Sequence, residues 1–210
     1  PEKRVKTMSK KGILIVVSGP SGGGKGTVVR RMREMLPEIG FSVSATTRPP
    51  RTGEVDGEDY YFITREKFTA MIGGGEMLEH TEYCGNFYGT PRAEVERVTD
   101  SGRDMILEIE VDGASQVKKI YPDAVTVMLI PPTIEELERR LRCRGSETEE
   151  TIHSRLARAL EEIRLAETYD YVVVNRCGDV DGCAERLCSI MAAEHSKSSR
   201  MTEDINNFKK

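Results

Sequence analysis

The sequence predicts an α/β fold in which helices flank both faces of a parallel sheet. Apolar runs typical of buried strands alternate along most of the chain with segments of helical periodicity, and this alternation favours a parallel sheet. One of these runs, ILIVV at 13–17, leads directly into a glycine-rich loop and then into a helical pattern. The length of 210 residues and the hydrophobic content of 38% suit one compact domain with inserted subdomains.

The charge and the cysteine content exclude several classes of protein. A net charge of −4 argues against a general nucleic-acid or membrane-surface binder, and no apolar run approaches membrane-spanning length. The five cysteines contain no CxxC pair, so they indicate reduced thiols in a cytoplasmic protein rather than a disulfide framework. The three histidines lack metal-ligand spacing, and we expect them to be structural or surface residues. We interpret residues 1–11 as a loose tail, with a candidate natural start at Met8.

The loop GPSGGGKGT at 19–27 predicts a phosphate-binding site. Its glycines let the backbone turn its N–H groups around an anion, and the following helix presents its positive end to the same place. Lys25 can reach the outer phosphates of a nucleotide, while Thr27 or Ser21 supplies a hydroxyl near a metal ion. Gly26 departs from the usual motif, which has Ser or Thr at that position. The alternative is a glycine-rich turn that binds nothing.

The first half of the chain then predicts a helix, a strand and a small excursion. The loop helix should end near Pro37, with one apolar side formed by Val28, Val29, Met32 and Leu36. FSVSA at 41–45 has strand character, and a segment rich in Pro, Gly and charge closes in a short strand at 60–62. A short helix at 65–72 is stopped by glycines, and a strand with a turn follows at 76–89.

The second half alternates more regularly. We expect a helix from Pro91 to about Ser101 and a strand, DMILEIEV at 104–111, with Glu108 and Glu110 on one face near its end. A short helix and a buried strand at 124–130 follow.

Two charged helices are expected next. The first, at 131–145, has Ile134, Leu137 and Leu141 on one side and ends at Gly145. The second, at 146–170, begins with a capping box of Ser146 and Glu149. The last strand is expected at 171–175 and the last helix at 180–195, and the polar tail from Ser196 is expected to fray. Together the boundaries predict a core of 12–46, 93–130 and 170–195, a small, mostly β subdomain at 47–92, a lid with flanking helices at 131–169, and a tail at 196–210.

Polar residues follow the predicted strands where ligands bind in an open α/β sheet. Because the carboxyl ends of parallel strands meet at one edge, Lys25, the Glu108/Glu110 pair and Asn175 should lie together. A carboxylate pair opposite a phosphate loop suits Mg²⁺ held through water. The alternative is that Glu110 only caps its strand and meets solvent.

Two further clusters carry arginine. The first contains Ser44, Arg48, Arg51, Glu54, Tyr60, Glu79, Tyr88 and Thr90. Its arginines can present forked donors to a phosphate, and its tyrosines can add neutral donors. The second contains Arg139, Arg140, Arg142, Arg144, Arg155 and Arg158. By default such a run is a solvated helix face, but beside a phosphate loop it suits phosphoryl transfer between two nucleotides.

In the order of its motifs the chain resembles the guanylate kinase family from about residue 12 to residue 195. The motifs are GPSGGGKGT, FSVSATTRPPRTGEVDGEDYYF, GNFYGT, ILEIE, RLRCRGSETEETIHSRL and VVVN. The second of them distinguishes this family from other nucleoside monophosphate kinases. The resemblance implies a three-layer P-loop kinase fold with a small mixed α/β GMP-binding subdomain and a helical lid. It also implies Mg²⁺-dependent transfer of the γ-phosphoryl group of ATP to GMP or dGMP, giving ADP and GDP or dGDP.

The resemblance also implies roles for individual residues. The transferring group would be attended by Lys25, Arg48, Arg144 and Arg155. ATP would be bound by Ser21, Gly22, Gly23, Gly24, Lys25, Gly26, Thr27 and Asn175, the last on the adenine side. The GMP phosphate would be bound by Arg48, Arg51, Tyr60 and Tyr88, and guanine by Ser44, Glu79 and Thr90. Glu54 would orient Arg48 or Arg51, Glu108 and Glu110 would complete the GMP pocket, and the metal would meet Thr27 and Glu110, the latter through water.

These roles agree with elementary chemistry. Guanine presents adjacent N1–H and N2–H₂ donors that one carboxylate such as Glu79 can accept, whereas adenine would leave that carboxylate unpaired. The acceptor phosphate is largely ionised at pH 7, because its second pKa is about 6, so no general base is needed. A lid flanked by arginines would exclude water during the transfer.

Two departures from the family pattern and two alternatives remain. Glu110 stands where the family more usually has Asp, and Asp112 stands where many members have glutamine. One alternative is a non-catalytic interaction module related to guanylate kinases, which the intact Lys25 and its glycines argue against. The other is a P-loop kinase for another small molecule, such as ribose bisphosphate. We expect ATP and GMP or dGMP as the partners, with no nucleic acid, membrane or obligate protein partner.

Overall fold

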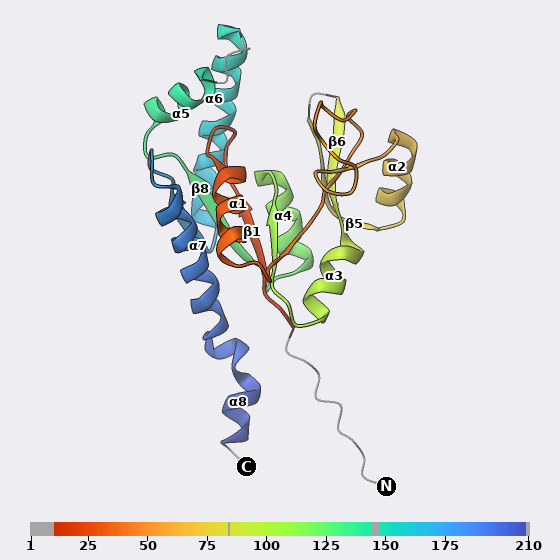
Figure 1. Cartoon of the computed structure of the whole chain (residues 1–210), viewed down its shortest axis with the longest axis vertical. Helices are drawn as coiled ribbons and strands as arrows, with labels where there is room; N and C mark the ends of the chain where they lie inside the picture. Colours follow the sequence, from red (N-terminus) through yellow and green to blue (C-terminus); the bar gives the residue numbers. More distant parts are fainter. Residues whose placement is uncertain (1–10, 84, 144–147, 209–210) are drawn as a thin grey trace.

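The computed structural model describes residues 11–83, 85–143 and 148–208, which form two sheets (Figure 1). The larger sheet has five strands in the order β2-β7-β1-β8-β9, and all its neighbouring strands are parallel. Its strands are β1 (Leu14–Ser18), β2 (Gly40–Phe41), β7 (Met105–Glu108), β8 (Val125–Ile130) and β9 (Tyr171–Val174). The parallel sheet predicted from the alternation of apolar and helical segments is therefore confirmed.

Helices cover both faces of this sheet because successive side chains of each strand point to opposite sides. Ile15 and Val17 of β1 pack with α1 (Lys25–Met35) and α7 (Val180–His195). Leu14 and Val16 belong to a second apolar cluster with residues of α3 (Arg92–Asp100) and α4 (Val111–Ile120). The prediction of a three-layer α/β fold is confirmed.

The smaller sheet has four strands in the order β4-β3-β6-β5. They are β3 (Ala45–Thr46), β4 (Tyr61–Phe62), β5 (Met77–Tyr83) and β6 (Asn86–Pro91). Helix α2 (Arg65–Gly73) packs on this sheet through Phe68, which is fully buried and stacks on Phe87 with 5.3 Å between the ring centroids. Thr64 caps α2 by accepting a hydrogen bond from the Lys67 amide.

The predicted strand at 41–45 is divided between the two sheets. Phe41 pairs in the larger sheet, whereas Ala45 pairs in the smaller one. The backbone between them bonds in both directions, since the Ser42 N–H donates to Ile106 and the Ser44 carbonyl accepts from Tyr61. The alternation of FSVSA suits an extended chain, but it carries no signal for a change of partner strand.

The two charged helices are α5 (Ile134–Arg142) and α6 (Glu149–Arg164), and a 3₁₀ turn η1 (Leu165–Thr168) follows α6. They pack through a cluster that includes buried Leu137 and Leu141. Ile134, predicted on the same side, is instead 49% exposed because it is the first residue of its helix. The cap of α6 is Thr148, which accepts from Thr151, and the predicted cap Ser146 and helix end Gly145 lie outside the described residues.

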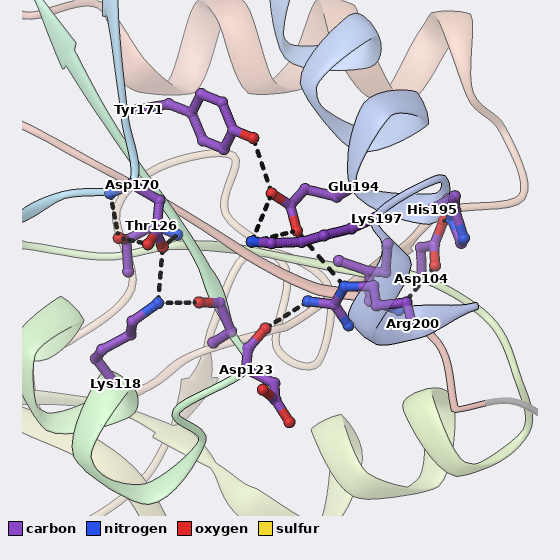
Figure 2. Close-up of polar contacts among 12 residues, drawn as sticks. Asp104, Lys118, Asp123, Thr126, Asp170, Tyr171, Glu194, His195, Lys197 and Arg200 are labelled. Carbon is purple, nitrogen blue, oxygen red and sulfur yellow. Dashed lines mark hydrogen bonds and ion pairs between the residues drawn. The ribbon is translucent and has the colours of Figure 1, made fainter. Parts of the chain in front are cut away.

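The prediction that the chain frays after Ser196 is wrong. A 3₁₀ turn, η2 (Ser198–Arg200), and a helix, α8 (Thr202–Asn207), follow α7. Figure 2 shows that Arg200 donates to the Asp123 carbonyl at 2.6 Å and lies 3.5 Å from the Glu194 carboxylate. The contact with Asp123 joins residues 77 positions apart, so the local polarity of the tail could not predict it.

Arg200 belongs to a group of polar residues at the amino ends of β8 and β9, which we call the basal cluster. Its members are Lys118, Thr126, Asp170, Tyr171, Glu194, Lys197 and Arg200 (Figure 2). The Glu194 side chain is buried and accepts from the Tyr171 hydroxyl at 2.8 Å. Among the described residues no helix is both long and apolar enough to cross a lipid bilayer.

Candidate active site

A cavity of about 540 Å³ opens at the carboxyl edge of the larger sheet, opposite the basal cluster. Its lining includes Ser21 and Lys25 from the glycine-rich loop, Glu79 and Tyr88 from the smaller sheet, Glu108 from the end of β7, and Arg155 and Arg158 from α6. This volume lies in the range of small-molecule sites, and these four separate parts of the chain contribute to its wall. The cavity therefore brings together residues from all three clusters of the sequence prediction.

The glycine-rich loop adopts a backbone that side chains rarely permit. Gly22 and Gly24 have φ values of 87° and 89°, in the left-handed region. Gly24 is also the N-cap of α1 and gives it no side-chain cap, so the first N–H groups of the helix face the loop. The Lys25 ammonium folds back and donates to the Gly19 carbonyl, and its side chain is only 10% exposed. This arrangement presents backbone donors and one cation to an anion.

Two residues support the loop from behind. The buried side chain of Asn175 donates to the Gly23 carbonyl at 2.8 Å. Arg140 donates to the same carbonyl at 3.3 Å and to the Asn175 carbonyl at 2.9 Å, while Glu136 accepts from it at 2.7 Å. Asn175 is thus placed against the loop itself. No sequence motif gives Arg140 a separate role, because 117 positions lie between Arg140 and Gly23.

The carboxylate of Glu108 lies against the glycine at position 26. A Cβ atom on Gly26 would lie 3.3 Å from a Glu108 carboxylate oxygen, so a side chain there would require the carboxylate to shift by a few tenths of an ångström. Burial raises the pKa of Glu108, and nearby Lys25 opposes that rise. The departure from the usual loop motif is therefore matched by a carboxylate at the end of β7.

The sequence predicts Glu108 and Glu110 on one face of a strand, and this prediction is wrong. The strand ends at Glu108, and Glu110 is the N-cap residue of α4. Its side chain is 44% exposed, and it lies 3.7 Å from the Lys25 ammonium. Both carboxylates nevertheless line the cavity. Thr27 is exposed on the first turn of α1.

Arg48 is held in place by a carboxylate and two aromatic rings. Glu54 accepts from both terminal nitrogens of Arg48, at 2.7 and 2.8 Å, and also from the Arg51 backbone N–H at 2.7 Å. The hydrogen bond from Arg48, and after it the one from the Arg51 backbone, lower the pKa of Glu54 to about 2. The hydrogen bond to Glu54 in turn raises the pKa of Arg48. The guanidinium also lies 5.1 Å from the centroid of the Tyr60 ring and 5.6 Å from that of the Phe62 ring. Glu54 therefore occupies the fork of Arg48 and fixes the direction of its guanidinium.

Tyr60 and Tyr88 form the neighbouring wall of the cavity. Their ring centroids are 6.1 Å apart in an edge-to-face arrangement, and both residues line the cavity with Ser44 and Arg51. Burial raises the pKa of Tyr60, so its hydroxyl remains a neutral donor at pH 7. The two tyrosines therefore stand beside Arg51 on the same side of the cavity.

Glu79 is a buried carboxylate in the wall of the cavity. It is 4% exposed, and its Oε1 accepts from the hydroxyl of fully buried Thr90 at 2.7 Å. A Cβ atom at Gly113 would lie 2.6 Å from Glu79 Oε2, so that glycine makes room for the carboxylate. Burial raises the pKa of Glu79 to about 7, although the hydrogen bonds from Thr90 oppose the rise. A carboxylate in this state gains from further N–H donors.

The arginines around α5 and α6 fall into distinct groups. Arg139 and Arg142 pair with carboxylates on the helix surface, as a solvated face predicts. Arg155 and Arg158 of α6 line the cavity, and Arg144 lies outside the described residues. Tyr83 and Glu162 also line the cavity, but no sequence motif marks either residue, so neither was predicted.

Comparisons with known proteins agree with this geometry. A sequence model of the guanylate kinase family matches residues 11–194. The chain is 53% identical to a guanylate kinase of Lactococcus lactis over 93% of its own length and 95% of that protein. It is 50% identical to a guanylate kinase of Halalkalibacterium halodurans over 95% and 97% of the two chains. Its structure resembles the crystal structure of guanylate kinase from Anaplasma phagocytophilum with a TM-score of 0.75 and 37% identity, over 92% and 91% of the chains.

Proposed function

The chain belongs to the guanylate kinase family and transfers a phosphoryl group from ATP to GMP, and we propose how its own residues divide this work. The glycine-rich loop binds the phosphates of ATP, and the smaller sheet binds GMP. One observation carries this division: a single cavity has Lys25 on one wall and the buried Glu79 on another. The two sites therefore open into the same space, as direct transfer between two nucleotides requires.

On the donor side, backbone N–H groups at the start of α1 bind the phosphates, assisted by the side chain of Lys25. Asn175 and Arg140 act through the loop, because both donate to the Gly23 carbonyl and so fix the direction of the backbone. The roles of Ser21 and Thr27 follow from their positions beside the same helix end. In this assignment the adenine side of the site lies near Asn175.

We propose Mg²⁺ as the metal that accompanies ATP. The exposed Thr27 and the partly exposed Glu110 beside the cavity offer the oxygen ligands that this ion prefers. Residues 11–83, 85–143 and 148–208 contain no group of three or more His, Cys, Asp or Glu side chains that could hold a metal. Phosphate oxygens and water therefore supply most of its ligands, and the bound ion would neutralise phosphate charge.

On the acceptor side, Arg48 and Arg51 bind the GMP phosphate together with Tyr60 and Tyr88. Glu54 acts on the phosphate through Arg48 and Arg51, because it accepts from the forked guanidinium of Arg48 and from the Arg51 backbone N–H. Glu79 accepts the N1–H and N2–H₂ donors of guanine, with Thr90 and Ser44 beside it. Adenine has no N–H at N1, so it would leave the buried carboxylate short of a donor, at a cost of about 1–3 kcal/mol.

The transfer itself needs alignment and positive charge rather than a proton acceptor. The GMP phosphate is already largely dianionic at pH 7, because its second pKa is about 6. Lys25 and Arg155, which line the cavity, neutralise the moving group, and Arg144 is proposed to join them. Residues 47–92 act as the GMP subdomain and residues 131–169 as the lid, on a core of 12–46, 93–130 and 170–195. We also propose dGMP as a substrate and the cytoplasm as the location, where thiols such as exposed Cys143 stay reduced.

A coupled assay of ADP production tests these assignments across GMP, dGMP, AMP, CMP and UMP. We expect GMP and dGMP to be phosphorylated far faster than the other three. Equal rates with AMP would contradict the role of Glu79. The matched variant Glu82→Gln changes an exposed glutamate of the same strand and should leave the order of substrates unchanged.

A further inference from the structure

Two long side chains meet across the nucleotide cavity. Arg158 extends from α6, and Tyr83 is the last residue of β5. The guanidinium carbon of Arg158 lies 5.5 Å from the centroid of the Tyr83 ring, within the range of a cation–π interaction. Both residues line the cavity, and Figure 1 shows α6 and the β5–β6 hairpin on different sides of α1. The contact therefore joins the wall formed by α6 to the wall formed by β5.

A carboxylate one turn along α6 fixes the direction of Arg158. Glu162 accepts from the Arg158 Nε at 2.9 Å, and the Glu162 side chain is only 12% exposed. Glu110 and Asp112 also lie near enough to favour the positive charge of Arg158. The guanidinium is thus held by Glu162 on its own helix while it faces the ring of Tyr83 across the cavity.

The two partners belong to the elements that carry the chemistry. Side chains two apart on a strand share a face, and Glu79, Thr81 and Tyr83 of β5 all line the cavity. Residues three apart on a helix also share a face, which places Arg155 beside Arg158 on α6. The contact therefore links the strand that carries Glu79 to the helix that carries Arg155.

We propose that Arg158 is a positioning residue that acts through Tyr83 to hold the cavity closed over bound GMP. This inference rests on the assignment of the cavity to GMP. The contact opposes the separation of the two walls that GMP needs in order to leave. Its loss weakens GMP binding, while Lys25 and the glycine-rich loop remain in place for the transfer.

Steady-state kinetics at saturating ATP, combined with calorimetric titration of GMP alone, test the proposal in Arg158→Ala, Tyr83→Leu and the double variant. We expect each single variant to raise the KM and the Kd for GMP about threefold to tenfold, with kcat within about twofold of the parent. The double variant should be no worse than the weaker-binding single variant, because both remove the same contact. Arg158→Lys and Tyr83→Phe should restore most of the binding, since they keep a cation and a ring.

A matched pair outside the cavity provides the control. Arg65 lies 4.2 Å from the centroid of the Phe87 ring and pairs with Glu82 at 3.2 Å, so it has the same kinds of partner as Arg158. Arg65→Ala should leave the KM for GMP unchanged. Arg158 and Tyr83 are both partly exposed, with side-chain and residue exposures of 46% and 36%, so their variants should fold, and a thermal melt checks this.

Two results would overturn the proposal. The first is a double variant whose increase in KM equals the product of the single increases, because Arg158 would then act independently of Tyr83. The second is a KM for GMP within about twofold of the parent in both single variants, below the smallest effect expected of such a contact. A parent enzyme that phosphorylates AMP as well as GMP would instead contradict the assignment of the cavity to GMP. That result is distinct from the first two, because it concerns the parent enzyme and not the coupling between Arg158 and Tyr83.

Discussion

Two buried glutamates near opposite edges of the larger sheet have nearly the same exposed fraction, but their pKa values are shifted in opposite directions. Glu79 is 4% exposed and Glu194 is 3% exposed. Burial would raise the pKa of both, but Tyr171 and Lys197 donate to Glu194 and bring its pKa below the usual value. Thr90 offsets burial only in part at Glu79, whose pKa rises to about 7. Glu194 already has the donors that a buried carboxylate needs, whereas Glu79 can gain more from a ligand.

The cavity beside Glu79 is also larger than the cavity beside Glu194. The active-site cavity measures about 540 Å³, whereas the cavity beside the basal cluster measures about 140 Å³. In the basal cluster Asp170 accepts from Lys118 and from Thr126, so its charge is matched within the fold. Burial of a charged group therefore does not by itself mark a site. A buried carboxylate marks a site when the fold supplies it with few hydrogen-bond donors and a large cavity lies beside it.

The largest effect should come from Lys25→Ala at the carboxyl edge. We expect kcat to fall about 100- to 1,000-fold, because the loop loses the cation that neutralises the outer phosphates. The Kd for GMP should hardly change, since the smaller sheet remains intact. Single-turnover kinetics and calorimetry measure the two quantities. Near-normal turnover would remove Lys25 from the centre of the mechanism.

Glu79→Gln should have the next largest effect. The amide can accept only one of the two guanine donors and adds an N–H of its own, so kcat/KM for GMP should fall about 10- to 100-fold. The preference for GMP over AMP should shrink by a similar factor. Competition between the two nucleotides in one assay measures this preference directly, and an unchanged ratio would show that another residue recognises the base.

Glu194→Ala should act on stability and leave catalysis alone. It removes a buried carboxylate that pairs with Tyr171, Lys197 and Arg200, so the free energy of unfolding should fall by about 2–4 kcal/mol. Urea denaturation measures the change, with Glu185→Ala at an exposed position of the same helix as the control. A large loss of kcat at a temperature where the variant is folded would contradict the contrast between the two edges.

The smallest effect should appear in the pH dependence. GMP needs Glu79 as a carboxylate, so the affinity for GMP should fall by up to about tenfold from pH 7 to pH 6. Stability changes in the opposite sense. Because the folded-state pKa is raised from 4.5 to about 7, the native state binds more protons between these values. This contribution to stability is fully present below pH 4.5 and is lost as the pH rises through 7.

Denaturation of the parent and of Glu79→Gln at several pH values isolates the contribution of Glu79 to the free energy of unfolding. The difference in unfolding free energy should move in favour of the glutamine variant as the pH rises from 5 to 8, because glutamine does not titrate. Glu194 and Asp170 have lowered pKa values, so their contributions are lost on acidification instead. A difference that is flat with pH would mean that Glu79 does not titrate in this window.

The fold was predictable where the signal lies within a few neighbouring residues. Strand β8 and helix α7 follow directly from their apolar patterns, and the order Gly24, Lys25 and helix identifies the phosphate loop. The contacts of Asn175 with Gly23 and of Arg200 with Asp123 were not predictable, because 152 and 77 positions separate the partners. No local pattern records which distant carbonyl a side chain will meet.

The candidate site shows the same division. Sequence motifs brought out residues such as Arg48 and Glu79, whose types and spacing suit phosphate and guanine. They did not show that Glu110 leaves the strand to cap α4, because a single change of backbone direction separates the two conformations. Tyr83 was missed because its importance depends on Arg158, which reaches it from another part of the fold.

Within the described residues, the chain passes between the two sheets at Ser42–Ser44 on the way in and at the junction of β6 with α3 on the way out. Non-covalent contacts also join the sheets, because Leu78 of β5 packs in the apolar cluster of the core and the His80 backbone exchanges two hydrogen bonds with the Gln116 side chain of α4. A movement of the smaller sheet relative to the core must therefore either carry α4 with it or break these contacts. A pair of fluorescent labels on α2 and α4 would distinguish the two cases.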